Sequence, residues 1–259
     1  MFLSAHQPRL PPKRIISVVP SQTELLHYLG LETETIGITK FCVHPAAWWQ
    51  QKTRVGGTKN LDIDKILQLK PDLIIANKEE NVQQQIEMLA ENVPVWLTDV
   101  NDLKDARQMI LDLGSITHTT GNAEALEQLI TQGFTKLQQQ IRLHPARLRT
   151  CYLIWKNPYM AAGSHNFIHD MLQQAGFENA FASLSRYPTV DIQQIKESGA
   201  QLVLLSSEPY PFNEKHMREL GQALPGVQVA LVDGEMFSWY GSRLLQVPSY
   251  FEKLRQQLM

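Results

Sequence analysis

Residues 62–76, DIDKILQLKPDLIIA, and residues 191–205, DIQQIKESGAQLVLL, are two copies of one pattern at a constant offset of 129 residues. Each copy starts with an aspartate, continues with apolar residues at helical spacing, and ends after a turn in an apolar run long enough for one buried strand. The acidic residues Glu79 and Glu208 follow at the same offset. Because the register persists through helix, turn and strand, the repeat predicts two similar lobes.

Short apolar runs alternate with amphipathic segments over the first hundred residues. A β-branched run at 15–19 precedes a helix that we expect to open with Ser21 and Glu24 as a capping box and to close at Gly30. The other predicted strands lie at 36–39, 73–76 and 95–97, and the other predicted helices at 63–67 and 82–89. Strands separated by helices of this length indicate βαβ units and a parallel sheet.

The segment from 122 to 143 breaks this alternation, since its apolar residues fall at helical spacing without a strand beside them. A helix of that length is a rod of about 33 Å. We therefore expect an α/β protein with two lobes, each a mostly parallel sheet flanked by helices, bridged by one long backbone helix. The expected parts are a polar lead-in at 1–13, an N-terminal lobe at 14–118, the connecting helix at 119–145 and a C-terminal lobe at 146–259.

Composition narrows the classes of function. The net charge is −2 and no long block of like charges occurs, which argues against nucleic acid as a partner. No apolar run reaches the roughly 20 residues that a membrane span needs. The first residues lack the apolar region of a secretory signal, so the chain as given would be cytoplasmic, and an export signal outside the given sequence stays open as the alternative. Cys42 and Cys151 are expected to be buried thiols, and a disulfide between them stays open as the alternative.

Aromatic residues follow three of the predicted strands, where the loops should face a cleft between the lobes. They are Phe41, Trp48 and Trp49, with His44 among them, after the second strand, Trp155 and Tyr159 after a strand at 150–154, and Phe237, Trp239 and Tyr240 after a strand at 229–232. Rigid aromatic faces bind large, flat, partly apolar ligands at low entropic cost. The alternative for each of them is packing in the core.

The remaining motifs are weaker evidence for phosphate binding, metal binding or catalysis. The segment from Gly56 to Lys59 lacks the full phosphate-binding loop pattern, and Gly57 and Thr58 are expected to let the backbone approach a ligand closely. His44 stands alone as a weak metal candidate, so no metal held by protein ligands alone is expected. Ser21 lacks the flanking glycines of a nucleophile elbow. The sequence therefore predicts a binding protein, not an enzyme, with no required cofactor.

Four segments carry a family resemblance: RIISVVPSQTELLHYLG at 14–30, RVGGTKN at 54–60, LKPDLIIA at 69–76 and WYGSR at 239–243. The chain resembles the helical-backbone (class III) substrate-binding proteins of ABC importers, and within them is most similar to vitamin B12-binding proteins and their iron-chelate-binding relatives. The resemblance implies a monomer of two lobes that holds a small metal-containing ligand at their interface. A cobalamin-like corrinoid, haem or a ferric siderophore would be such a ligand.

The resemblance also implies roles for single residues. Pro20 and Ser21 would approach the ligand from the first lobe, Phe41 would occupy an aromatic position, and Trp155 would form an aromatic wall from the second. Glu235 lies near a family acidic residue, whereas Trp239 stands where the family pattern has an arginine. For docking on an ABC permease, Asp64 matches the acidic residue of the first lobe, and the second lobe has Gln193 at that position with Asp191 close by.

Two further hypotheses stay open. One is a cytoplasmic protein that binds a corrinoid or metal chelate for salvage or storage. The other is an enzyme that uses the same cleft, with Ser21, His44 or Glu235 as its reactive groups.

Overall fold

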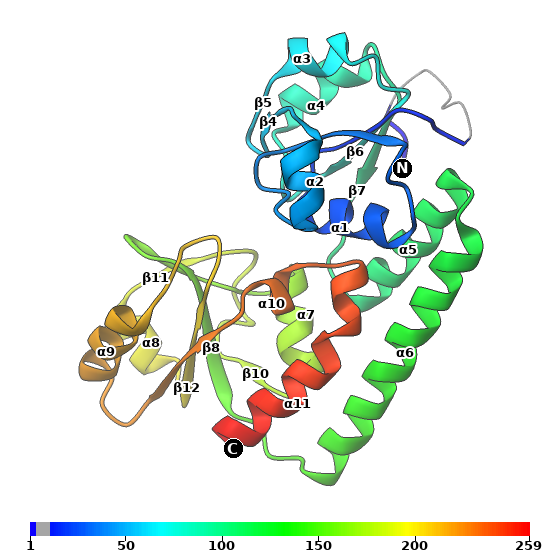
Figure 1. The fold of residues 1–259 in the computed structure, drawn as a ribbon. Helices are drawn as coiled ribbons and strands as arrows, with labels where there is room; N and C mark the ends of the chain where they lie inside the picture. The colour runs from blue at the N-terminus through cyan, green and yellow to red at the C-terminus, as the bar shows by residue number, and fades with distance from the viewer. Residues whose placement is uncertain (4–10) are drawn as a thin grey trace. The chain divides into compact units, whose positions relative to one another are not determined.

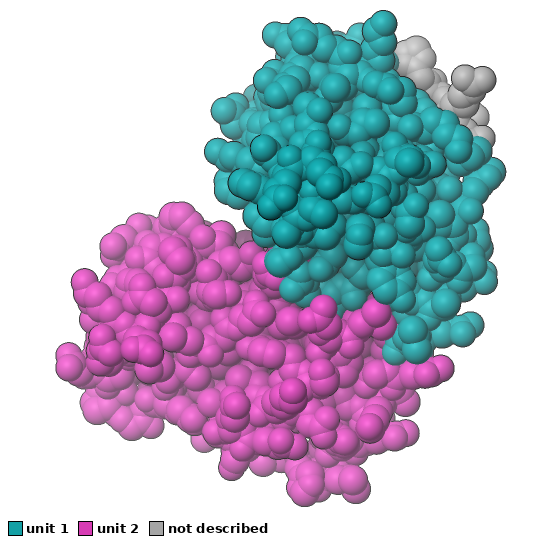
Figure 2. Space-filling view, viewed as in Figure 1, with its two compact units in different colours: residues 1–100, 104–129, 240–243 teal, residues 101–103, 130–239, 244–259 magenta. Residues whose placement is uncertain are grey.

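The computed structural model describes residues 1–3 and 11–259, and most of the predicted lead-in lies outside the described residues. The chain divides into two compact units (Figure 2). Unit 1 comprises residues 1–100, 104–129 and 240–243, and unit 2 comprises residues 101–103, 130–239 and 244–259.

Unit 1 contains a five-stranded parallel sheet in the order β3-β2-β1-β6-β7. Its strands are β1 (Ile15–Ser17), β2 (Thr35–Ile38), β3 (Thr53–Arg54), β6 (Leu73–Asn77) and β7 (Val95–Thr98). The hairpin of β4 (Gly56–Gly57) and β5 (Asn60–Leu61) stands apart from this sheet. The helices are α1 (Pro20–Tyr28), α2 (Ala46–Gln51), α3 (Ile63–Gln68), α4 (Gln83–Ala90), α5 (Leu103–Thr117) and the first part of α6 (Thr120–Leu143).

The core of unit 1 follows from strand alternation. Ile16 and Ile74 face α3 and α4, where they pack with Ile66 and Ile86. Ser17, on the opposite face, meets α1 through a 2.8 Å hydrogen bond from Thr23 Oγ1. Because successive side chains point to opposite faces, a strand with helices on both sides reads as a continuous apolar run.

Unit 2 contains a mixed sheet in the order β11-β9-β8-β12-β13, with β10 pairing with β8. Its strands are β8 (Arg149–Trp155), β9 (Tyr159–Ala161), β10 (Glu178–Asn179), β11 (Thr189–Val190), β12 (Leu202–Ser206) and β13 (Gln228–Val232). β10, β8, β12 and β13 are parallel, whereas β9 and β11 are antiparallel to their neighbours.

The helices of unit 2 cover both faces of this sheet. They are α7 (Phe167–Gln174), α8 (Ile192–Glu197), α9 (Glu214–Ala223), α10 (Glu235–Ser238) and α11 (Val247–Leu258). A 3-10 turn (Ser242–Leu245) belongs to unit 1 up to Arg243 and to unit 2 from Leu244. In Figure 1, α8 and α9 lie on one side of the sheet and α7, α10 and α11 on the other. Leu153 and Val203 pack toward Ile195 and Leu220 of α8 and α9. Tyr152 points the other way, with its ring 5.0 Å from that of Phe237.

The predicted long helix is α6, which runs from Thr120 to Leu143 and ends before Pro145 (Figure 1). The division between the units falls inside it, after Leu129, instead of at its two ends. Residues 240–243 also count with unit 1, although we expected everything after 146 to form one lobe. The reason is local contact: Arg243 Nη2 lies 2.7 Å from Glu24 Oε1 of α1, and an added Cβ at Gly241 would lie 3.2 Å from Leu25.

The 129-residue repeat is present in the structure. Asp62 and Asp191 are the N-caps of α3 and α8, and each accepts a hydrogen bond from the backbone N–H three residues later. Both helices and the strands that follow, β6 and β12, keep the offset at both ends. The prediction of two lobes with similar sheets, each flanked by helices, is confirmed.

The predicted capping box at Ser21 is wrong. α1 begins at Pro20, two residues earlier than a helix capped by Ser21 would, and its N-cap Val19 makes no side-chain hydrogen bond. Proline suits the first helical position because its missing N–H would have no helical partner there. This leaves Glu24 available for its ion pair with Arg243.

The predicted lead-in is not wholly separate from the fold, since Leu3 N–H donates to Val95 O (3.0 Å) beside β7. Cys42 and Cys151 are buried free thiols, as expected. Burial raises the pKa of both. Among the residues that the structure describes, no helix is both long enough and apolar enough to cross a membrane.

Candidate ligand-binding site

The strand order of unit 1 creates a switch point between β1 and β6. From β1 the chain moves outward to β2 on one side, and it later returns to place β6 on the other side. At such a point the loops after the two strands diverge and leave a crevice outside their carboxyl ends, where open α/β sheets bind ligands. Pro20 and Ser21 follow β1, and residues 78–81 follow β6. The predicted positions of Pro20 and Ser21 are therefore at this edge.

Two buried asparagines organise the edge. Asn81 Nδ2 donates to the carbonyl oxygens of Val18 (3.1 Å) and Thr58 (3.2 Å), and its Oδ1 accepts the N–H of Asn77 (2.9 Å). Asn77 Oδ1 in turn accepts the N–H of Glu79 at 2.7 Å. One side chain thus ties the end of β1, the β4–β5 turn and the end of β6 together. Sequence reasoning missed both residues, although polar amides directly after a buried strand are a usable signal.

Phe41 is an exposed aromatic residue at this edge, with 51% of its surface accessible. Its ring lies over the β4–β5 turn, because an added Cβ at Gly57 would stand only 3.1 Å from Phe41 Cε2. The ammonium of Lys40 lies 5.1 Å from the ring centroid. The structure therefore brings Phe41 and Gly57 together, and Thr58 lies buried in the same turn.

In unit 2 the corresponding switch point lies between β8 and β12. Trp155 is the last residue of β8 and is 41% exposed. Its ring meets the ring of Tyr210 edge to face, with centroids 5.6 Å apart. Tyr159, half-buried, begins β9 just beyond the turn. Trp155 and Tyr159 are therefore at a strand end, as predicted.

Glu208 is the central acceptor on the loop after β12. Its Oε1 accepts hydrogen bonds from Ser238 Oγ (2.6 Å) and from Trp239 Nε1 (2.9 Å). Gly234 allows this loop to approach α10, because a Cβ there would overlap Ser206 Oγ. Glu235 is the first residue of α10 and is half-buried. The predicted residues Glu235 and Trp239 thus lie at the same edge as Trp155, with Trp239 held by Glu208.

Four of the predicted aromatic ligand residues are buried: Trp48, Phe237, Trp239 and Tyr240. Trp48 is 1% exposed, and its ring packs edge to face on His27 at 5.3 Å. Phe237 is 0% exposed and its ring centroid lies 4.8 Å from that of Phe251. Neither has accessible surface for a ligand, so the packing alternative holds for both. Tyr240 is also buried, and burial raises the pKa of its hydroxyl well above the ordinary value.

His44 is half-buried and precedes a cis peptide bond to Pro45. Across residues 1–3 and 11–259, no three His, Cys, Asp or Glu side chains gather in a way that could hold a metal ion.

The predicted docking residues are exposed on the two repeat helices. Asp64 is in the first turn of α3, and Gln193 takes its place on α8, where its Nε2 donates to Glu197 Oε1 at 2.7 Å. Asp191 is the N-cap of α8 and accepts the Gln194 N–H at 2.7 Å. Asp191 therefore corresponds to the helix cap of the first copy and not to Asp64.

A pocket of about 620 Å³ lies elsewhere in unit 2. It is lined by the end of α6 and by α11, including Leu137, Ile141, Glu252, Arg255 and Met259. The end of α6 leads into the start of β8, so this pocket is at the amino ends of the parallel strands. Ligands of open α/β sheets bind at the opposite edge. We therefore do not assign the ligand to this pocket.

The exposed ring of Trp155 rests on a small group of aromatic residues. Tyr210 packs against His216 with centroids 5.4 Å apart, and its hydroxyl lies 3.3 Å from His216 Nε2. Phe212 meets the same imidazole at 5.5 Å. His216 Nδ1 accepts the N–H of Asn213 at 3.2 Å, which completes the cap of α9. Neutral His216 is required for this acceptor role.

This arrangement predicts a pH dependence. Burial, and then the charge of Lys156, hold the pKa of His216 below its ordinary value of 6.5. The unfolded chain therefore binds the proton more readily, so the stabilisation is complete above pH 6.5 and is lost as the pH falls from there through the folded value. We expect urea unfolding of the wild type to show lower stability at pH 5 than at pH 8.

The matched variant is His216→Gln, which keeps an acceptor for the Asn213 N–H without titrating in this range. We expect a smaller stability difference between the two pH values than in the wild type. Lys215, Glu219 and Lys156, the other charged groups that act on His216, are unchanged in the variant. Equal pH dependence in both proteins would contradict the assignment.

Comparison with known proteins gives a consistent picture. The family model described as "Periplasmic binding protein" matches residues 15–222. The vitamin B12-binding protein of Pectobacterium carotovorum is 26% identical over 244 residues, covering 90% of this chain and 85% of that protein. The vitamin B12-binding protein of Vibrio parahaemolyticus is 24% identical over 196 residues, covering 75% and 70%.

Solved structures show the same fold. The periplasmic vitamin B12 binding protein of Vibrio cholerae superposes with a TM-score of 0.81 at 23% identity, covering 95% of this chain and 99% of that one. A periplasmic heme binding protein from Pseudomonas aeruginosa also gives 0.81, at 20% identity, with coverage of 94% and 92%.

Proposed function

Because the chain belongs to the periplasmic binding protein family, we propose that this solute-binding protein serves an ABC importer and that its ligand is a large metal-containing ring compound of the corrinoid type. The observation that carries the proposal is the pair of exposed aromatic side chains at strand carboxyl ends, Phe41 in unit 1 and Trp155 in unit 2. Each ring is supported from behind, Phe41 by the β4–β5 turn and Trp155 by Tyr210. Rigid, supported rings suit a wide, partly apolar ligand.

We propose a binding role without catalysis. The three reactive groups that an enzyme would use belong to separate segments. Ser21 lies at the start of α1, His44 precedes α2 and Glu235 is the first residue of α10. The similarity to vitamin B12-binding proteins also supports a bound corrinoid over a substrate that is converted.

The test is a titration of the protein with cyanocobalamin, dicyanocobinamide, haem and a ferric siderophore, followed by tryptophan fluorescence and corrected for ligand absorbance. Trp155 and Trp49 are the exposed reporters. We expect saturable quenching by a corrinoid at micromolar concentration or below. No binding of any of the four compounds would overturn the proposal.

Trp155→Ala is expected to weaken binding of that ligand by about 1 to 3 kcal/mol, which is about 5- to 150-fold, because a supported aromatic contact is lost. Phe41→Ala is expected to weaken it in the same range. Isothermal titration calorimetry measures both, since it does not depend on the fluorophore removed.

The control is Tyr28→Ala. Tyr28 is aromatic and 40% exposed, close to the value for Trp155, but it ends α1 at the opposite edge of the sheet. Its removal should leave the affinity unchanged. If Trp155→Ala and Phe41→Ala behave like this control, the ligand does not contact the strand ends.

A further inference from the structure

The loop after β6, residues 78–81 (KEEN), carries acidic side chains to the unit 1 edge. Its backbone is fixed on several sides. Asn77 Oδ1 accepts the N–H groups of Glu79 (2.7 Å) and Glu80 (3.2 Å), and Lys59 Nζ donates to the carbonyl oxygen of Glu79 (2.6 Å). Together with the three hydrogen bonds of Asn81, these contacts leave the loop little freedom. The backbone of Glu80 therefore stands at a defined place at this edge.

The carboxyl group of Glu80 is half-buried and accepts no hydrogen bond from any residue that the structure describes. Burial raises its pKa, and Lys59, which lowers it, compensates only partly while Glu79 adds to the rise. The charge of Glu80 also acts on Cys42 and Tyr240, which face it from the loop after β2 and from residues 240–243. A hydrogen-bond donor close to such a carboxylate stabilises its charged form.

A ligand that brings an N–H to this point supplies that donor. A ligand that brings a carboxylate adds like-charge repulsion with Glu79 and Glu80. Corrinoids of the cobalamin type carry primary amides around the ring, whereas haem carries two propionates. The chemistry of this edge therefore separates the two classes of ring compound.

Resting on the proposed function, we propose that Glu80 is a specificity-determining residue that accepts a hydrogen bond from an amide or amine at the ligand's periphery and disfavours ligands with carboxylates there. This role goes beyond stacking on the exposed aromatic rings, because those rings would bind any flat ring compound whatever its peripheral groups. It places the selection for ligand charge in unit 1, at the carboxyl end of β6.

The test uses two corrinoids with the same ring and metal. Dicyanocobinamide carries amides on its side chains, and dicyanocobyrinic acid carries carboxylic acids at the same positions. Calorimetry at pH 7.5 is expected to show that the wild type binds the amide compound tighter by on the order of tenfold. Glu80→Gln, which has the same shape without the charge, should bring the two affinities to within about threefold of each other.

Glu91→Gln is the control, since Glu91 is exposed at the C-cap of α4 and should leave both affinities unchanged. If corrinoids bind but the wild type does not discriminate between them, or Glu80→Gln leaves the ratio unchanged, the inference is overturned and the proposed function stands. Preferential binding of haem also overturns the inference. If no compound of either class binds, the proposed function fails and the inference fails with it.

Discussion

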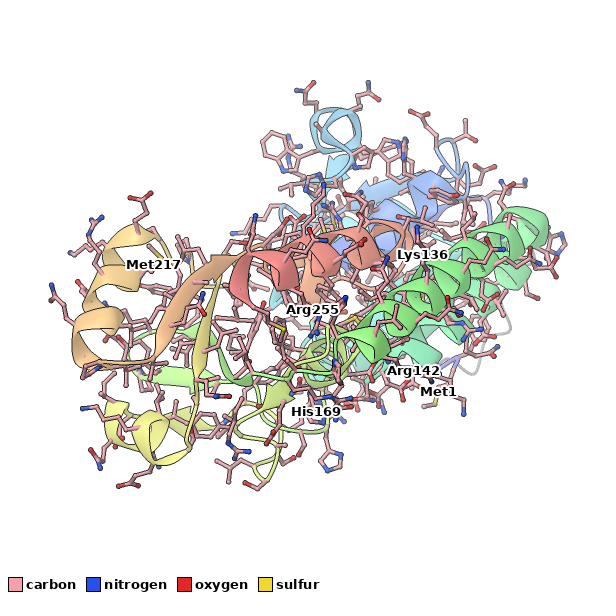
Figure 3. All side chains as sticks on the ribbon, turned by 90° about the horizontal axis from the view of Figure 1, so that it is seen from below. Met1, Lys136, Arg142, His169, Met217 and Arg255 are labelled. Atoms are coloured by element: carbon pink, nitrogen blue, oxygen red, sulfur yellow. The ribbon has the colours of Figure 1, made fainter. Side chains whose placement is uncertain are left out.

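Replacing Arg255 with methionine is expected to lower the free energy of unfolding by about 3 kcal/mol, because several buried acceptors lose a charged donor at once. Arg255 lies on α11 (Figure 3) and is only 8% exposed. Its Nη1 donates to the carbonyl oxygens of Ala175 (3.1 Å) and Gly176 (3.0 Å), and its Nη2 to those of His144 (3.0 Å) and Ala146 (3.3 Å).

These carbonyl groups lie at the C-terminal ends of two helices, α7 and α6. Ala175 is the C-cap of α7, and His144 directly follows α6. The last carbonyls of a helix have no partner within the helix, so a single guanidinium here satisfies the ends of both. Methionine is similar in length and apolar, so it fills the space without replacing the donors. The loss should therefore be one of hydrogen bonding and not of volume.

Urea denaturation followed by circular dichroism measures the change, and hydrogen exchange should locate it in α7 and α11. Arg142→Met is the control, because Arg142 is exposed on α6 (Figure 3) and its replacement should stay within about 0.5 kcal/mol. Equal stability of the two variants would show that the four contacts of Arg255 contribute nothing.

The second large effect is expected from Asn81→Ala in unit 1. Asn81 is buried, and its amide makes the three hydrogen bonds that join β1, β6 and the β4–β5 turn. Alanine would leave two carbonyl oxygens and one N–H unsatisfied, at a cost of about 2 to 4 kcal/mol. Because the acidic loop begins from the same network, corrinoid affinity should fall as well.

Asn92→Ala separates this effect from the general loss of an asparagine. Asn92 is exposed, with one 3.4 Å bond to Met88 O, and its replacement should change neither unfolding nor binding. Urea unfolding and calorimetry on the same samples measure the two quantities. Wild-type stability in Asn81→Ala would mean that the edge is held by the strands alone.

The local elements were largely predictable from the sequence. Asp62 and Asp191 cap helices of the same length at the predicted offset, and the apolar runs at β6 and β12 are buried strands. A helix cap, an amphipathic period and an apolar run each act over a few neighbouring residues. The local sequence is therefore enough to predict where these helices and strands form. The error at Ser21 is of the same local kind, because Pro20 competed for the first helical position.

The candidate site was predictable only in part. The sequence placed aromatic residues after the right strands, but it could not separate exposed Trp155 from buried Phe237. Phe237 is buried because Tyr152 of β8, distant in the chain, packs on it with ring centroids 5.0 Å apart. The importance of Asn81 likewise depends on a carbonyl oxygen 63 residues away, that of Val18.

The sequence by itself therefore determined the two repeated α/β lobes, the long helix and the family, since these follow from local periodicity and short motifs. Only the tertiary structure decided which aromatic rings stay exposed, which amides bind the strand ends together and which carboxylate, that of Glu80, has no donor among residues 1–3 and 11–259. The physical reason is that a side chain is buried or hydrogen-bonded only through a second group that packs against it or bonds to it. The partner of each of these groups comes from a part of the chain that periodicity does not connect to it.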